Sequence, residues 1–153
     1  MFWNDVRSLL ADLEAAMTSF SAIHACLFDR EWLSTRLRPV DYHGYVCALT
    51  EISAALERSC REAARLAAQP ESLTTFRDYF AALLPLLDAS RECVKGLRAY
   101  CVAMNGLGEG TEESLAEAQR LKDLYVRLGM RMHAARKVYS AASARWGFGW
   151  SLP

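Results

Sequence analysis

The sequence predicts an all-α protein, an antiparallel up-down-up-down four-helix bundle. In four segments, apolar residues recur at alternating steps of three and four, the spacing that lines one face of a helix. The connections between these segments are short, so consecutive helices are expected to run antiparallel. The 153-residue chain is 52% hydrophobic and 24% charged, a composition typical of one globular domain with its own core. We therefore expect a single helical-bundle domain over residues 1–146 and an aromatic tail over residues 147–153.

The first helix is expected to begin near Asn4 or Asp5, because either side chain can accept a hydrogen bond from an unpaired first-turn amide. Residues 29–37 could add a further short helix. The helical pattern must stop before Pro39, since the residue before a proline is pushed out of helical geometry. The apolar face of the first helix comprises Val6, Leu9, Leu10, Leu13, Met17, Phe20, Ile23 and Leu27.

The second helix is expected to begin after Asp41, which can act as its N-cap. Its apolar face continues to Ala67, and the turn that contains Pro70 ends it. That face comprises Tyr45, Leu49, Ile52, Leu56, Cys60, Ala63 and Ala67.

The third helix has the longest apolar face, from Leu73 to Met104, and the rest of the bundle is expected to pack around it. Pro85 lies inside this helix and removes the hydrogen bond to the Ala81 carbonyl, which predicts a kink. Because the apolar spacing keeps its phase on both sides of Pro85, we expect one bent helix. The face comprises Leu73, Phe76, Phe80, Leu83, Leu87, Ser90, Val94, Leu97, Cys101 and Met104.

The fourth helix is expected to start at Thr111 after the glycine-rich loop of residues 105–110. Glu112 and Glu113 follow directly, which places two acids at the positive end of the helix dipole. Its apolar face comprises Leu115, Ala118, Leu121, Tyr125, Leu128, Met132, Ala135, Tyr139, Ala142 and Trp146.

Charge is balanced over the whole chain, with 18 basic and 18 acidic residues, so the molecule as a whole is not attracted to nucleic acid or anionic lipid. The fourth helix is an exception, because residues 118–145 hold seven basic residues and one acid, Asp123. Four of these bases fall within about 40° around the helix axis. This stripe either pairs with acids of a neighbouring helix or binds an anionic partner, an acidic protein patch or, with less support, RNA or DNA. The stripe consists of Arg120, Arg127, Arg131 and Arg145.

The predicted topology brings the start of the first helix and the end of the fourth to the same end of the bundle. Five aromatic side chains are expected to gather there. They act either as a plug over the bundle end or as an anchor for a partner chain, including a second copy. These residues are Phe2, Trp3, Trp146, Phe148 and Trp150.

No metal or cofactor site is predicted. The three histidines lack the spacings that put two ligands on one helix face, and His24 is expected to be satisfied by a hydrogen bond. The five cysteines form no C-x-x-C pair, which favours a reducing compartment. Without a basic leader or an apolar run long enough to span a bilayer, the sequence predicts a cytoplasmic protein that does not enter a membrane.

Two short segments resemble the R-x(4–6)-H motif of HEPN ribonucleases. One runs from Arg127 to His133 and the other from Arg38 to His43. HEPN ribonucleases are helical proteins in which an arginine and a histidine assist RNA cleavage. The resemblance therefore implies Arg127 and His133 as catalytic residues.

The sequence thus predicts a non-enzymatic helical interaction module of the adaptor, chaperone, antitoxin or inhibitor type. It would present the basic face of the fourth helix and the aromatic end to another protein, acidic in character or a second copy of itself. No catalytic residue, metal or cofactor belongs to this interpretation. Two alternatives stay open: an HEPN-like ribonuclease, and a sensory bundle that holds a small apolar ligand or haem in its core.

Overall fold

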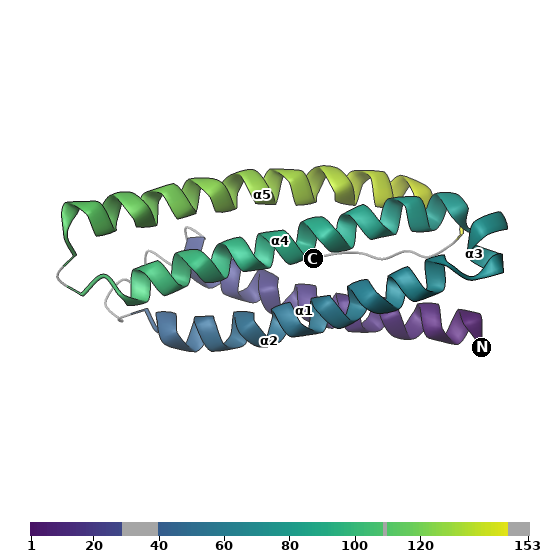
Figure 1. Ribbon diagram of the computed structural model, residues 1–153, viewed down its shortest axis with the longest axis horizontal. Coiled ribbons are helices and arrows are strands. Elements are labelled where there is room, and N and C mark those ends of the chain that lie inside the picture. Colours follow the sequence, from purple (N-terminus) through teal and green to yellow (C-terminus); the bar gives the residue numbers. More distant parts are fainter. Residues whose placement is uncertain (29–39, 109, 147–153) are drawn as a thin grey trace.

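The computed structural model describes residues 1–28, 40–108 and 110–146, and over that part of the chain all regular structure is helical. The four long helices lie side by side, and each runs antiparallel to the next (Figure 1). The predicted all-α bundle is confirmed. The helices are α1 (Phe2–Phe28), α2 (Tyr42–Ala67), the short α3 (Pro70–Thr74), α4 (Arg77–Asn105) and α5 (Glu112–Ala144).

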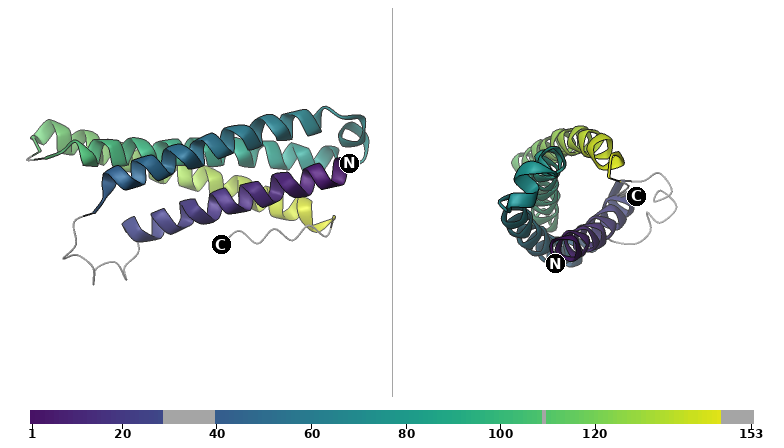
Figure 2. Two further views of the ribbon diagram at one scale, coloured as in Figure 1. Left: turned by 90° about the horizontal axis from the view of Figure 1, so that it is seen from below. Right: turned by 90° about the vertical axis from the view of Figure 1, so that its right-hand side faces the viewer.

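The four long helices form a ring when they are seen end-on (Figure 2). Helix α4 packs between α2 and α5, and α1 packs against α2. The backbones of α1 and α5 lie further apart, and aromatic side chains reach across the space between them. The ring centroids of Phe20 and Phe28 in α1 lie 6.5 and 5.7 Å from that of Tyr125 in α5.

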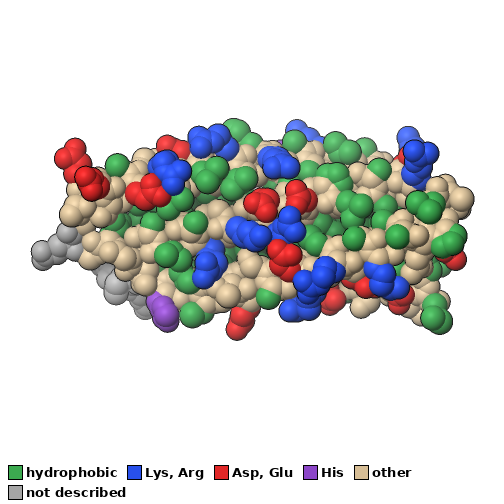
Figure 3. Space-filling view, in the orientation of Figure 1, with side chains coloured by type: hydrophobic (Ala, Val, Ile, Leu, Met, Phe, Trp, Pro, Cys, Tyr) green, Lys and Arg blue, Asp and Glu red, His purple; other side chains and the backbone are tan. Residues whose placement is uncertain are grey.

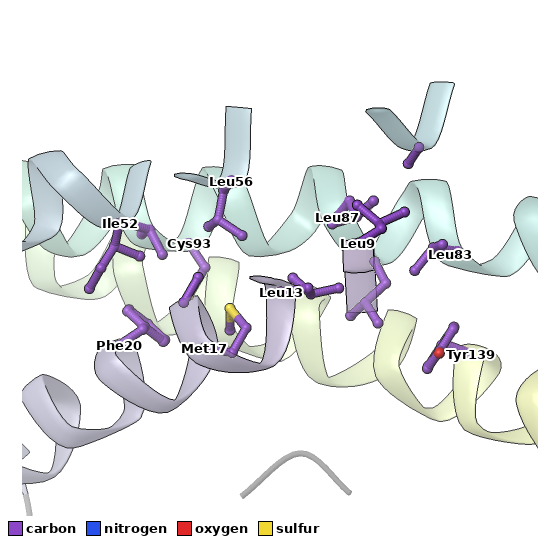
Figure 4. Packing of buried hydrophobic residues seen from close by; sticks show 14 of the residues in the cluster. Leu9, Leu13, Met17, Phe20, Ile52, Leu56, Leu83, Leu87, Cys93 and Tyr139 are labelled. Atoms are coloured by element: carbon purple, nitrogen blue, oxygen red, sulfur yellow. The ribbon is translucent and has the colours of Figure 1, made fainter. Parts of the chain in front are cut away.

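The core is built around α4, as predicted. All but two of the positions in its predicted apolar face are buried: Leu73 is exposed and Met104 is half-buried. Large side chains from every long helix point into the same space (Figure 4). Each fully buried leucine contributes roughly 1.5–3 kcal/mol relative to an exposed one. The residues labelled in the figure are Leu9, Leu13, Met17, Phe20, Ile52, Leu56, Leu83, Leu87, Cys93 and Tyr139.

The prediction that the third helix starts at Leu73 is wrong. Leu73 is 63% exposed and belongs to the separate turn α3. The Ser72 hydroxyl donates a hydrogen bond to the Leu66 carbonyl at 2.5 Å, which ties α3 to the end of α2. Phe76 then leaves helical geometry, with φ −111° and ψ 19°, and buries its ring. The apolar spacing of residues 73–80 therefore continues although the helix is interrupted between α3 and α4.

Helix α4 runs through Pro85 without interruption, so it is one element, as expected. Both Pro85 and Ala81 are exposed. Water can therefore hydrogen-bond to the Ala81 carbonyl that lacks its amide donor, which lowers the cost of a proline inside a helix.

The predicted cap at Asp41 is confirmed, and Thr111, where the fourth helix was expected to start, is the N-cap of α5. The Asp41 carboxylate accepts a hydrogen bond from the Gly44 amide at 2.8 Å. The Thr111 hydroxyl accepts one from the Ser114 amide at 3.2 Å. Each bond satisfies an amide that has no partner within its helix.

Other predicted positions at helix ends are wrong. Asn4 and Asp5 are not caps, because α1 already begins at Phe2 and the Met1 carbonyl accepts hydrogen bonds from both amides. Leu115 is exposed, because at 100° per residue it lies about 80° around α5 from the buried Tyr125. The further short helix expected over residues 29–37 lies outside the described residues. None of the described helices combines the length and the apolar character needed to cross a membrane.

Candidate interaction surfaces

The predicted aromatic end forms around Phe76. The rings of Phe2, Trp3 and Trp146 lie 5.8, 4.6 and 4.6 Å from the Phe76 ring, measured between centroids. The structure thus brings together the start of α1, the turn before α4 and the residues after α5. The two remaining predicted members, Phe148 and Trp150, lie outside the described residues. The sequence placed Phe76 in the core but gave no sign that it joins the two chain ends.

This aromatic end is packed on its inner side and open on its outer side. Phe76 is buried, whereas Trp3 and Trp146 keep 40% and 37% of their surface exposed. Met1, which is close to Trp3 in the sequence, and Leu73, which lies in α3, are also large apolar residues that stay exposed. The indoles therefore cover the bundle end and also offer apolar surface to a partner.

Three of the four stripe arginines are paired with carboxylates. The pairs are Arg120 with Glu117 at 2.7 Å, Arg131 with Asp88 at 3.6 Å and Arg145 with Asp78 at 3.7 Å. The last two join α5 to α4, but they are long and exposed, so each contributes little to stability. Arg127 forms no ion pair with another described residue. The stripe is thus partly tied down within the molecule and partly available.

A charged network that the sequence did not reveal crosses α2, α4 and α5. Arg91 lies at its centre, 2.6 Å from Asp88 and 3.6 Å from Glu57. Lys95 lies 3.3 Å from Glu57, and its hydrogen bond, with the nearby guanidinium groups, lowers the pKa of Glu57. Because its members pair with one another across three helices, the network presents no unpaired charge, but its side chains are partly exposed and each pair contributes little to stability.

The outward face of α5 carries an apolar ridge that the prediction missed. Val126, Met130, Ala134 and Val138 recur at steps of four, and all are exposed; the three larger side chains keep 51–62% of their surface exposed. Met130 lies nine residues from the buried Tyr139, half a turn around the helix. We call these four residues the outer ridge.

The surroundings of the outer ridge are basic. Residues 124–144 contain no acid, and Arg127, Arg131 and Lys137 lie beside the ridge in the sequence. In the space-filling view, apolar side chains alternate with Lys and Arg side chains along the edge that α5 forms (Figure 3). The ridge could have been found from the sequence, because its members fall outside the apolar face predicted for this helix.

An open groove of about 930 Å³ lies between α1 and α2. Its floor and walls are mostly alanine, serine and isoleucine, and four carboxylates and one guanidinium line it. We call it the α1–α2 groove. From α1 it is lined by Asp5, Ser8, Leu9, Asp12, Ala15, Ala16, Ser19, Ala22 and Ile23, and from α2 by Ala48, Glu51, Ile52, Ala55, Arg58, Ser59 and Glu62.

Two hydrogen bonds between side chains join α5 to α1 and α4. His24 Nδ1 lies 2.6 Å from the hydroxyl of Tyr125, so the expected hydrogen bond of His24 is confirmed. The hydroxyls of Tyr79 and Tyr139 lie 3.1 Å apart in the core, and burial raises the pKa of both phenols. These bonds fix α5 against α1 and α4.

The described residues hold no group of three or more His, Cys, Asp or Glu side chains that could bind a metal ion. A haem between the helices would need two side chains that face each other across the core, and Met17 with His133 is the pair to consider. Met17 is buried in the core but His133 is exposed on α5, so the two do not face each other.

The residues of the HEPN-like motif lie on the surface. Arg127 and His133 are both exposed on α5, six residues and therefore about 120° apart around the helix. His43 is exposed at the start of α2, where its Nε2 lies 3.8 Å from the sulfur of Cys47. Arg38 lies outside the described residues.

The chain matches no known family model, and no curated protein or solved structure matches it either. Function must therefore be inferred from the surfaces themselves. Three of them stand out: the aromatic end, the outer ridge of α5 and the α1–α2 groove.

Proposed function

We propose that the protein is a non-enzymatic helical interaction module that binds a partner protein through the outward face of α5. The outer ridge carries this proposal. Large apolar side chains in the middle of an exposed helix, flanked by bases, are typical of a contact surface, whereas single scattered ones need no explanation. Helix α5 packs one side against α4, and the side that carries the outer ridge stays exposed and can contact another molecule.

Charge indicates the kind of partner. Arg127 forms no ion pair with a described residue, and Arg131 is held only by a 3.6 Å contact with Asp88. Both guanidinium groups could form charge-assisted hydrogen bonds with carboxylates that approach the ridge. A partner with an acidic surface around an apolar centre therefore fits this face best. The aromatic end is a second contact in this proposal, because Trp3 and Trp146 offer half-exposed indoles.

The proposed location is the cytoplasm. All five cysteines are free thiols in the structure, which suits a reducing compartment.

The ridge can be tested by capturing partners from the cells in which the protein occurs. Tagged wild type and Met130→Glu are compared, with Val102→Glu as a matched control, since Val102 is also an exposed apolar residue but lies on α4. We expect Met130→Glu to lose the captured partner and Val102→Glu to retain it, with both variants melting like the wild type. Equal capture by all three proteins would overturn the proposal.

A further inference from the structure

We propose that the α1–α2 groove of one copy receives the outer ridge of α5 from a second copy, so that the protein associates head to tail. This inference rests on the proposed function, because it names the partner of the outer ridge. Shape and charge carry it.

The groove has the form of a seat for a helix. Its lining residues on α1 recur at steps of three and four, from Asp5 to Ile23, and those on α2 do the same from Ala48 to Glu62. Two parallel-sided rows with this spacing are what a third helix packs against in a bundle. The α1 row is about 27 Å long and the ridge from Val126 to Val138 is about 18 Å long, at 1.5 Å per residue. The ridge therefore fits within the groove.

Side-chain size is complementary as well. Half of the residues that line the groove are alanine or serine, which leaves room for the backbone of a third helix to approach. The ridge supplies the larger side chains, Val126, Met130 and Val138. Knobs on one surface thus face holes on the other.

Charge decides which two surfaces meet. Asp12 and Glu51 line the groove, are exposed and form no ion pair with a described residue. Asp5 and Glu62 lie further along the groove, where Arg65 already bridges them at 3.1 and 2.6 Å. Two grooves facing each other would bring unpaired carboxylates together, and two ridges would bring arginines together. Arg58 also lines the groove, but the four carboxylates leave it with a net negative charge, so groove against ridge pairs surfaces of opposite net charge.

The contact is heterologous, because each copy inserts its outer ridge into a neighbour and accepts the ridge of another copy in its α1–α2 groove. Such contacts build closed rings or open chains rather than simple two-fold dimers. A copy with a damaged ridge can still bind the ridge of another copy in its groove, and a copy with a damaged groove can still insert its ridge into another copy. Two inactive variants should therefore complement each other.

The test uses full-length protein and light scattering at high micromolar concentration. Met130→Glu damages the ridge, and Ala15→Arg fills the groove with a cation that repels the ridge. Ala15 is exposed, so the larger side chain leaves the core intact. Val102→Glu and Ala54→Arg are the matched controls, since both residues are exposed and neither lies in the groove or on the ridge.

We expect the wild type and both controls to exceed the monomer mass, and each damaged variant alone to remain monomeric. An equimolar mixture of the two damaged variants should reach twice the monomer mass and no more. A monomeric wild type, oligomers that survive either substitution, or a mixture that stays monomeric would each overturn the inference. A monomeric wild type would leave the proposed function standing if Met130→Glu still abolished capture of a different partner.

Discussion

Gly96 of α4 lies against α5, and its replacement by alanine should reveal how tightly the two helices pack. A Cβ atom at Gly96 would lie 2.7 Å from Cδ1 of Leu128. At that distance the leucine must move, and because Cδ1 is the free end of a half-buried side chain, the cost should lie at the low end of overpacking, about 1 kcal/mol. Alanine also removes the entropic cost of glycine inside a helix, which is worth roughly 0.5–1 kcal/mol. We therefore expect Gly96→Ala to be neutral or destabilising, although helix propensity alone favours it.

Gly129→Ala is the matched control, because Gly129 also lies inside a long helix but a Cβ atom there meets nothing within 4 Å. Its free energy of unfolding should rise by about 1 kcal/mol. The propensity terms cancel between the two variants, so the difference of about 1 kcal/mol reports the contact with Leu128. Urea denaturation followed by circular dichroism measures both. Equal stabilisation by the two substitutions would refute the contact between Gly96 and Leu128. A double-mutant cycle is a second check: Leu128→Ala should cost a different free energy in the wild type than in Gly96→Ala, and equal costs would also refute the contact.

Three further predictions follow from the same structure. Burial raises the pKa of Tyr79 and Tyr125 above the ordinary value of 10.0, so above pH 10 the unfolded chain loses protons that the folded chain keeps. Below pH 10 these phenols should not affect the free energy of unfolding. Above pH 10, urea denaturation should show that free energy falling by about 1.4 kcal/mol per pH unit for each phenol. A free energy of unfolding that stays constant up to about pH 11 would contradict their burial. Burial also raises the pKa of Cys93 to about 12 and of Cys101 to about 11, so iodoacetamide at neutral pH should leave both unmodified while the exposed thiols react, as read by mass spectrometry. Asp41→Ala should cost about 1 kcal/mol of stability and Asp41→Asn much less, because asparagine can still accept the hydrogen bond from the amide of Gly44; equal losses would argue against the cap.

The core could be predicted from the sequence wherever one apolar face repeats over many turns. Helix α4 is the best case, because eight of its ten predicted positions are buried. The error at Leu73 arose because the spacing of apolar residues shows which side of a helix they occupy, but it does not show whether the helix is continuous between them. The error at Leu115 arose because steps of three and four drift from a straight line on a helix of 3.6 residues per turn.

The candidate surfaces were harder to predict, for two physical reasons. The α1–α2 groove is made largely of alanine and serine, which suit a buried or an exposed position equally, so only their placement in space shows a cavity. The charged network around Arg91 joins residues far apart in the sequence, and such pairs cannot be deduced without the helix packing. The arginine stripe and the aromatic end were visible in the sequence because each depends on local spacing or on topology alone.

The outer ridge would give a reversible rather than a permanent association. Burying the exposed parts of Val126, Met130 and Val138 would supply about 3–5 kcal/mol, whereas a micromolar complex needs about 8 kcal/mol beyond the cost of immobilising two molecules. The groove must supply the remainder through its exposed alanines, Ala15 and Ala22, and through ion pairs with Asp12 and Glu51. Since those ion pairs are solvent-exposed, their share should fall as salt screens them. A contact of this composition forms at high local concentration and releases its partner readily, which is how an adaptor works and not how an obligate oligomer does.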